Sequence, residues 1–221
     1  MLTNQMNTLK PRLLALLFVL PVLSYAQNTI ESYVGYSIDL VNKPSFGQAN
    51  IGLQYPVINH RVYQMLIRVQ GALPLSNHSG IDAAYTSNPL LPLNITAAYK
   101  AKWYSAAFII GNRFKLIAWY KNSISPFVNA GIAYQKINTA YDNYNMEQYT
   151  VLNPHRDLKK IGLCIGGGIQ YKRNLGTGAV FLQVEVLSSP LVDSVNNYSY
   201  KLPVPLSINI GYVVEFKNRN K

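Results

Sequence analysis

The stretch LSINIGYVVEF, residues 206–216, decides the fold because its side chains alternate between two characters. One set is apolar and consists of Leu206, Ile208, Ile210, Tyr212, Val214 and Phe216. The other set is small or polar and includes Ser207, Asn209, Gly211 and Glu215. Successive side chains of a β-strand point to opposite faces, so the pattern predicts a strand with one apolar and one polar face. A soluble sandwich would bury the apolar face, whereas a membrane barrel would turn it toward lipid.

The same alternation recurs along the chain, and no convincing amphipathic helix follows the first 26 residues. It predicts strands over 30–41, 46–55, 61–72, 93–117, 126–137, 160–172, 179–187 and 206–216. Long loops rich in Pro, Asn, Ser or Tyr are expected over 73–92, 138–158 and 188–204. If 93–117 is one strand, the count is eight, with the short joints on one rim and the long loops on the other. A further short strand hidden in a loop would raise the count to ten.

The polar faces favour a barrel over a sandwich. Several strand glycines share them, namely Gly35, Gly52, Gly131, Gly162, Gly166, Gly168 and Gly211. A narrow barrel needs such gaps for larger side chains that reach across the lumen. The same faces carry the residues of a predicted lumen charge network: Asp39, Arg68, Arg113, Lys115, Glu185 and Glu215. A small barrel can pair these charges inside, whereas a sandwich core could not hold them. We therefore predict an all-β fold, an eight-stranded antiparallel up-and-down transmembrane β-barrel with its polar face inside.

The start of the chain predicts export. Lys10 and Arg12 precede an apolar run over 13–23, and the small residues around Ala26 suit a signal peptidase. The run is too short to cross a membrane as a helix, which needs about 18 or more apolar residues. The expected organisation is a signal peptide over 1–26, removed after Ala26, a barrel domain over 27–216 and a basic tail over 217–221. Removing 26 of the 221 residues leaves 195, which suits one domain.

Composition restricts the partners. Cys164 is the only cysteine in the sequence, so no disulfide framework is expected. The formal net charge of +11 comes from scattered Lys and Arg residues, and in an exported chain this pattern argues against nucleic acid. His60, His78 and His155 lack the paired spacing of a zinc site, so neither a metal nor another cofactor is expected.

The closing stretch resembles a known assembly signal. Asn209, Gly211, Val214 and Phe216 match the terminal pattern read by the barrel assembly machinery of Gram-negative outer membranes. PFVNAGIAYQ (126–135), GLCIGGGIQYK (162–172) and SINIGYVVEF (207–216) likewise resemble strands of the outer-membrane beta-barrel domain family, the small porin-like barrels of the OmpA and OmpX kind. The resemblance implies a protein of the cell outer membrane that contacts lipid and lipopolysaccharide and uses this machinery during biogenesis. In the family pattern the aromatic residue ends the chain, whereas here residues 217–221 follow it.

The rim of long loops suggests a binding role. It carries Tyr141, Tyr144, Tyr149, Tyr198 and Tyr200 among asparagines, a composition suited to adaptable contacts with an extracellular glycan or protein. Basic residues of this rim could pair with lipopolysaccharide phosphates, namely Lys136, Arg156, Lys159, Lys160 and Lys201. The predicted function is therefore a non-enzymatic outer-membrane barrel with a structural or surface-binding role.

Three alternatives stay open. A narrow porin-like channel requires ten or more strands, because side chains fill an eight-stranded interior. A soluble periplasmic lipocalin-like ligand binder requires the apolar faces to be inside. A lipid A modifying barrel enzyme requires a serine activated by a histidine and a carboxylate, and the only local pairing is His78 and Ser79 with Asp82 nearby. Adjacent residues on an extended segment point to opposite sides, which disfavours that pairing.

Overall fold

The structure is a computed structural model, and it describes residues 29–41, 45–60, 62–142, 144–152, 157–188 and 204–216. The predicted signal peptide and basic tail lie outside these ranges. So do Arg156, Tyr198, Tyr200 and Lys201 of the predicted loop rim.

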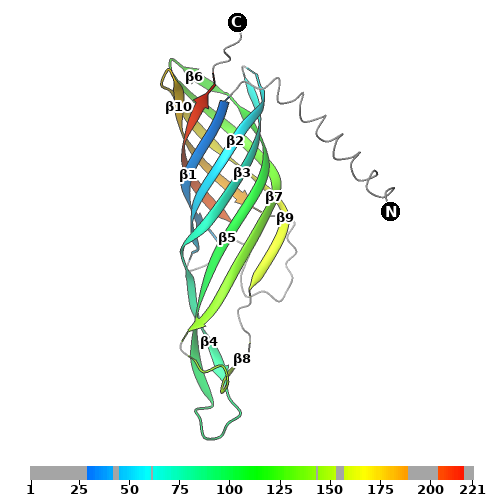
Figure 1. Cartoon of the computed structure of the whole chain (residues 1–221), viewed down its shortest axis with the longest axis vertical. Helices are drawn as coiled ribbons and strands as arrows, with labels where there is room; N and C mark the ends of the chain where they lie inside the picture. The colour runs from blue at the N-terminus through cyan, green and yellow to red at the C-terminus, as the bar shows by residue number, and fades with distance from the viewer. Residues whose placement is uncertain are drawn as a thin grey trace, which may run out of the picture.

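The described residues form one antiparallel sheet that closes into a barrel (Figure 1). Its strands are β1 (Thr29–Asp39), β2 (Gly47–Asn59), β3 (Tyr63–Ser76), β4 (His78–Tyr85), β5 (Asn94–Phe114), β6 (Ile117–Trp119), β7 (Asn122–Asp142), β8 (Thr150–Val151), β9 (Leu158–Asn174), β10 (Gly178–Ser188) and β11 (Pro205–Glu215). Closure comes from β1 and β11, which pair from Thr29 opposite Glu215 to Asp39 opposite Pro205. The closing stretch that decided the fold in the sequence is thus the strand that seals the wall.

The wall of the barrel has eight strands, as predicted: β1, β2, β3, β5, β7, β9, β10 and β11. β3 and β4 lie in line along β5, because β3 pairs with residues 105–114 and β4 with residues 94–101. β6 is a short arm beside β7, and β8 pairs with β4. The region 93–117 contains a single long strand up to residue 114, which resolves the count in favour of eight over ten.

The polar face is inside and the apolar face is outside, as the alternation predicted. Gln48, Arg68 and Glu185 are buried in the lumen, whereas Val34, Ile51 and Ile210 are each more than 60% exposed on the outer wall. A continuous apolar surface of this kind would make a protein aggregate in water, and it is typical of the outer surface of a barrel that faces lipid. A soluble lipocalin-like binder needs the opposite arrangement, so the structure argues against that alternative.

Glycines on the inner face make room for rings, as predicted. The ring of Tyr33 lies where a side chain at Gly52 would have to stand, and the ring of Phe181 lies in the same way against Gly211. Tyr33 and Phe181 pack edge to face with centroids 6.5 Å apart. The missing side chains therefore let two aromatic residues fill a narrow lumen.

β5 and β7 are much longer than a membrane requires. Each has 21 residues, whereas a transmembrane strand needs about 9–11. Their surplus projects beyond the barrel, at the end opposite the start of β1 and the end of β11 (Figure 1). We call this projection the stalk and define it as β4, β8, residues 94–101 of β5 and residues 138–142 of β7.

The prediction of long loops over 73–92 and 138–158 is therefore partly wrong. Residues 78–85 form β4 and residues 150–151 form β8, while β7 continues to Asp142. The Pro, Asn and Ser content suggested loops, but β5 supplies hydrogen-bonding partners to β4 over its full length. Pairing with a distant strand outweighs local composition here.

Candidate functional site

The described residues of the lumen form two buried ion pairs. The first pair lies near the rim where β1 begins. Arg113 donates from Nη1 to Glu31 Oε1 at 3.0 Å and from Nη2 to Glu31 Oε2 at 2.9 Å. Gln54 donates to Glu31 Oε2 at 2.8 Å, and Arg113 also donates to Gln64 at 3.3 Å. Glu31 was not among the predicted network residues, although it lies on the same face as Tyr33 and belongs to the same alternation.

The second pair joins Arg68 and Glu185. Arg68 donates from Nη1 to Glu185 Oε2 at 2.7 Å and from Nη2 to Oε1 at 2.5 Å. Asn129 and Gln183 donate to the same carboxylate at 2.6 and 3.0 Å. The Glu185 carboxylate thus accepts four hydrogen bonds in a site where neither charged side chain meets solvent. Such saturation is what allows a charged pair to be buried.

The other three predicted network residues do not join these pairs. Asp39 is buried at the opposite rim, where its Oδ1 accepts backbone hydrogen bonds from Val41 at 3.0 Å and Val204 at 2.9 Å. Lys115 is half-buried and donates to Asn59 Oδ1 at 3.3 Å. Glu215 is exposed at the end of β11. Of the six residues of the predicted lumen charge network, Arg68 and Glu185 thus pair with each other, Arg113 pairs with Glu31, and the other three lie apart from these pairs.

An aromatic plug fills the lumen where the stalk joins the barrel. We define it as Phe46, His78, Tyr99, Trp103, Ile137 and Leu158, which are all buried. The Phe46 ring stacks on the His78 ring with centroids 5.0 Å apart and packs edge to face against the Trp103 ring with centroids 6.1 Å apart. Gln48 donates to the Trp103 carbonyl at 2.9 Å and so connects the plug to the polar lumen. An internal cavity of about 20 Å³ lies beside Trp103, which is room for about one water molecule.

The residues considered for catalysis do not converge. His78 belongs to the plug, whereas Ser79 is exposed on the opposite face of β4. His78 Nε2 lies 3.5 Å from the Tyr99 hydroxyl, and Asp82 accepts a 2.6 Å hydrogen bond from the hydroxyl of Tyr141. Burial and the nearby Asp82 carboxylate raise the pKa of Tyr99 above its usual value. No histidine-activated serine is formed by these residues.

The stalk has its own small core. Ala84 on β4, Ala97 on β5 and Val151 on β8 are buried against Tyr149, and Tyr141 and Tyr144 pack around them. The Tyr141 ring also packs against the Tyr99 ring, with centroids 5.9 Å apart, and this contact links the stalk core to the plug. Of the predicted loop tyrosines, the structure therefore brings Tyr141, Tyr144 and Tyr149 together as a packing cluster.

The predicted basic residues fall on two faces. Lys136 on β7 and Lys159 on β9 are registered partners on the outer face, whereas Lys160 points inward. Lys136 also pairs across β5 with Tyr104, whose ring lies 6.0 Å below its Nζ. Lys102, two residues before Tyr104, is exposed on the same face, and the sequence reasoning missed it. We call Lys102, Lys136 and Lys159 the basic row.

The residues of the predicted assembly signal lie at the seam of the barrel. Asn209 is buried in the lumen, Gly211 faces the Phe181 ring, and Val214 is exposed on the outer wall. Phe216 follows the last residue of β11 and is exposed.

Among the described residues no cluster of His, Cys, Asp or Glu could hold a metal ion. A helix long and apolar enough to cross a membrane is likewise absent from the described ranges.

Comparisons with known proteins give a match in fold. No protein-family model matches the sequence, and no curated protein matches it either. The crystal structure of Ail, the attachment invasion locus protein of Yersinia pestis, is 12% identical with a TM-score of 0.43, covering 86% of this chain and 99% of Ail. Ail in complex with the heparin analogue sucrose octasulfate gives 12% identity, a TM-score of 0.42 and the same coverage. The outer membrane enzyme PagL is 13% identical with a TM-score of 0.39, covering 85% of this chain and 99% of PagL. At these identities and TM-scores the likenesses carry no argument about what this chain does.

Proposed function

We propose that this protein is a non-enzymatic integral barrel of the cell outer membrane that binds an extracellular partner through its stalk. The observation that carries the proposal is a packed β-structure that extends well beyond the length needed to cross a bilayer. A barrel that only spans the membrane needs no such extension. The start of β1 and the end of β11 lie at the other end of the barrel, which suits an orientation with the short turns in the periplasm (Figure 1).

Embedding in the outer membrane is supported by the apolar outer wall and by the signal peptide that the sequence predicts. In this proposal residues 1–26 direct export and are removed after Ala26, and the barrel assembly machinery recognises Asn209, Gly211, Val214 and Phe216. Heat-modifiability tests it directly. The expected result is an outer-membrane protein whose mobility on a detergent gel shifts after boiling. Free protein in the periplasm without such a shift would refute the membrane location.

The stalk is suited to binding because it is ordered and yet exposes apolar side chains. Its core and the Tyr141–Asp82 hydrogen bond hold β4, β5, β7 and β8 together. On the outer side, Ile81 is 70% exposed and Leu152 is 66% exposed, with Tyr85 on the same face of β4. Exposed apolar side chains outside the membrane belt mark an interaction surface. We call Ile81, Tyr85 and Leu152 the stalk patch.

The test uses the stalk patch and a matched control. Cells that display the double variant Ile81→Asp, Leu152→Asp should lose adhesion to host-cell proteins and glycans that the unaltered protein supports. The control is Asp142→Asn, which alters the exposed Lys100–Asp142 pair of the same stalk. Both variants must stay heat-modifiable, because only then does lost adhesion report on the patch. Equal adhesion by the patch variant and the unaltered protein would refute stalk binding.

A conducting role is disfavoured by the filled lumen. The plug and the two ion pairs occupy the interior in series, and eight strands leave little further room. We expect no steady conductance in planar-bilayer recordings. A stable unitary conductance would favour the narrow channel instead. The lipid A modifying activity is tested separately by lipid A acylation, which should be unchanged in the variant His78→Ala, Ser79→Ala.

Lipopolysaccharide is the second partner that the structure favours. Three registered rows follow one another toward the stalk on the outer faces of β5, β7 and β9. The first row is Phe108, Ile132 and Leu163, and the second is Ala106, Tyr134 and Ile161. The third row is Tyr104, Lys136 and Lys159. The outer surface thus changes from apolar to basic within one step. Within the described ranges none of the three basic-row lysines forms a salt bridge. Phosphates at the membrane surface would provide the missing charges.

Replacing Lys102, Lys136 and Lys159 with glutamine should reduce the thermal stabilisation that lipopolysaccharide gives to the reconstituted barrel. The matched control is Lys121→Gln, because Lys121 lies 5.4 Å over the Tyr120 ring at the opposite rim. Added salt should weaken the stabilisation of the unaltered protein and have less effect on the triple variant. Equal losses in the triple variant and the control would remove the basic row from the proposal.

A further inference from the structure

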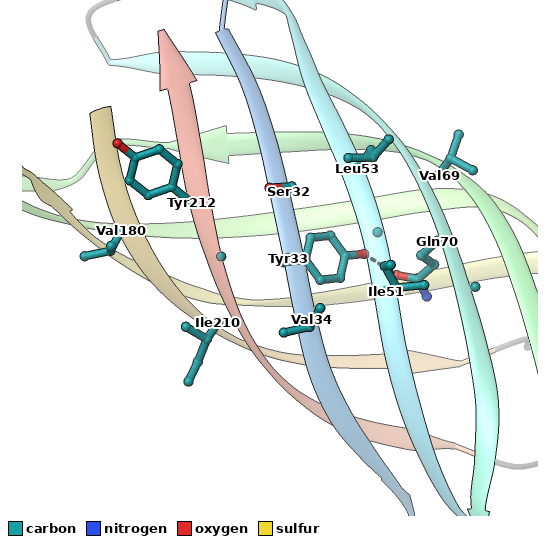
Figure 2. Close-up of a pocket in the computed structure, with 13 residues that line it drawn as sticks. Ser32, Tyr33, Val34, Ile51, Leu53, Val69, Gln70, Val180, Ile210 and Tyr212 are labelled. Carbon is teal, nitrogen blue, oxygen red and sulfur yellow. Dashed lines mark hydrogen bonds between the residues drawn. The ribbon is translucent and has the colours of Figure 1, made fainter. Parts of the chain in front are cut away.

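A groove of about 730 Å³ crosses the outer wall over β10, β11, β1, β2 and β3 (Figure 2). Its sides are exposed apolar side chains: Val34, Ile51, Leu53, Val69, Val180, Ile210 and Tyr212. The hollow forms where two small residues, Ser32 on β1 and Gly71 on β3, take outward positions between them. A side-chain carbon built on Gly71 would meet no atom within 4 Å.

The floor of the groove is supported from inside the barrel. Figure 2 shows Tyr33 pointing toward Gln70, and its hydroxyl donates to Gln70 Oε1 at 2.9 Å. The Tyr33 ring fills the space behind Gly52, and the Phe181 ring fills the space behind Gly211. Because these rings are buried and packed, the wall cannot collapse inward to close the groove. The groove is therefore a formed feature of the surface.

The groove is continuous with the belt that faces lipid in the proposed membrane location. Hydrocarbon is the surrounding medium there, and an empty hollow would forfeit the dispersion contacts of its lining. Its walls offer few hydrogen-bonding groups, so water is a poor occupant. A flexible hydrocarbon chain can follow a curved hollow over five strands.

The position of the groove identifies the leaflet. We call the rim where β1 begins and β11 ends the termini rim. Within a few residues of this rim lie Ser32, Val180 and Tyr212. Ile51 and Gly71, in contrast, lie near the middle of their strands. The groove thus runs from near the termini rim toward the middle of the wall. In the proposed orientation that rim faces the periplasm, where the leaflet consists of phospholipid. We propose that the groove binds one acyl chain of a phospholipid from the periplasmic leaflet, an inference that rests on the proposed membrane location.

The test is native mass spectrometry of the full chain, released into detergent from vesicles of phosphatidylethanolamine and phosphatidylglycerol. The unaltered protein should retain one phospholipid per barrel. Gly71→Leu, which fills the hollow, should lower the retained phospholipid about tenfold because the leucine takes the contacts of the chain. The control is Ala130→Leu, a similar enlargement of an exposed residue on β7, which should retain phospholipid like the unaltered protein. Ser32→Leu is a second groove variant and should behave like Gly71→Leu.

Each variant is first checked for heat-modifiability, so that a folding failure is not read as lost binding. Equal retention by Gly71→Leu, Ser32→Leu and the unaltered protein would overturn the inference, and so would an equal loss in Ala130→Leu. The inference would also be overturned if the unaltered protein showed the mass of a dimer and only the groove variants lost it, because a second copy of the chain would then occupy the groove. Preferential retention of lipopolysaccharide from mixed vesicles would overturn the choice of leaflet. A heat-modifiable barrel that retains no phospholipid refutes this inference alone, whereas a chain that never enters vesicles refutes the membrane location with it.

Discussion

The substitution Glu185→Gln should destabilise the folded barrel by about 3–5 kcal/mol. Glutamine keeps the size of the side chain, but it leaves the Arg68 charge without a partner in a site that is 3% exposed. Removing one member of a buried ion pair costs about this much, because the remaining charge is desolvated and uncompensated. The four hydrogen bonds that the carboxylate accepts make Glu185 the more sensitive partner to test.

The double variant Arg68→Met, Glu185→Leu separates the charge from the packing. Replacing a whole buried pair with apolar side chains is neutral or stabilising by about 1–4 kcal/mol. Against this gain, Asn129 and Gln183 would each lose an acceptor, at a cost of about 1–3 kcal/mol each. The sum gives a net loss of about 2 kcal/mol, which is smaller than the loss expected from Glu185→Gln alone.

The assay is urea titration of the barrel refolded into lipid vesicles, with the folded fraction measured from the band of the unheated sample. Asp142→Asn is the control, because the Lys100–Asp142 pair is exposed and should contribute about 0–1 kcal/mol. A loss in Glu185→Gln no larger than in the control would refute the assignment of a buried pair whose carboxylate accepts four hydrogen bonds. A double variant less stable than the single variant would show that hydrogen bonds outweigh the unpaired charge.

Two further perturbations test other parts of the molecule. Gly211→Leu should destabilise the barrel by about 1–3 kcal/mol or prevent folding, because the new side chain meets both the Phe181 ring and the backbone carbonyl of Ser32. Phe181→Ala in the same chain removes only the first of these contacts, so the heat-modifiable band should return only in part. Tyr141→Phe removes the 2.6 Å hydrogen bond to Asp82, so the free energy of local opening in β4 should fall by about 1.5–3 kcal/mol. Amide exchange should then quicken in β4 and stay unchanged in β10, and equal protection of β4 in both proteins would contradict a stabilising role for this bond.

The faces of the strands could be predicted from the sequence because alternation is local. Ile208, Ile210 and Tyr212 on the outside and Ser207 and Asn209 on the inside follow from a period of two within one short stretch. The strand count also followed, since it depends on the spacing of apolar runs and turns. These features need no knowledge of which strand lies beside which.

The pairing of the charges could not be predicted in the same way. Arg68 meets Glu185 across 117 residues, and the meeting depends on the register of several strand pairs in a closed wall. Glu31, in contrast, could have been identified, because extending the alternation of β1 by one step toward its start places it on the face of Tyr33. The same counting from Leu158 separates the outward Lys159 from the inward Lys160.

The stalk was hidden because its strands lack the apolar outer face of the membrane belt. β4 reads as HSGIDAAY, in which only Ile81 and Tyr85 are large outward residues. Its partner is the first third of β5, and that pairing requires β5 to continue beyond Lys102, where the proposed membrane boundary lies. Composition could suggest only that this segment is not in lipid, and it could not distinguish a loop from an extramembrane strand.

The distribution of packing indicates where function can lie in this molecule. Ion pairs and an aromatic plug occupy the lumen, so a ligand entering there would have to displace buried, hydrogen-bonded groups at a cost of several kcal/mol. The outer wall offers a groove of a size suited to hydrocarbon, and the stalk offers exposed apolar side chains on an ordered scaffold. The proposed recognition outside the membrane is therefore assigned to the stalk, because this part of the described chain combines a packed core with exposed apolar side chains beyond the barrel wall.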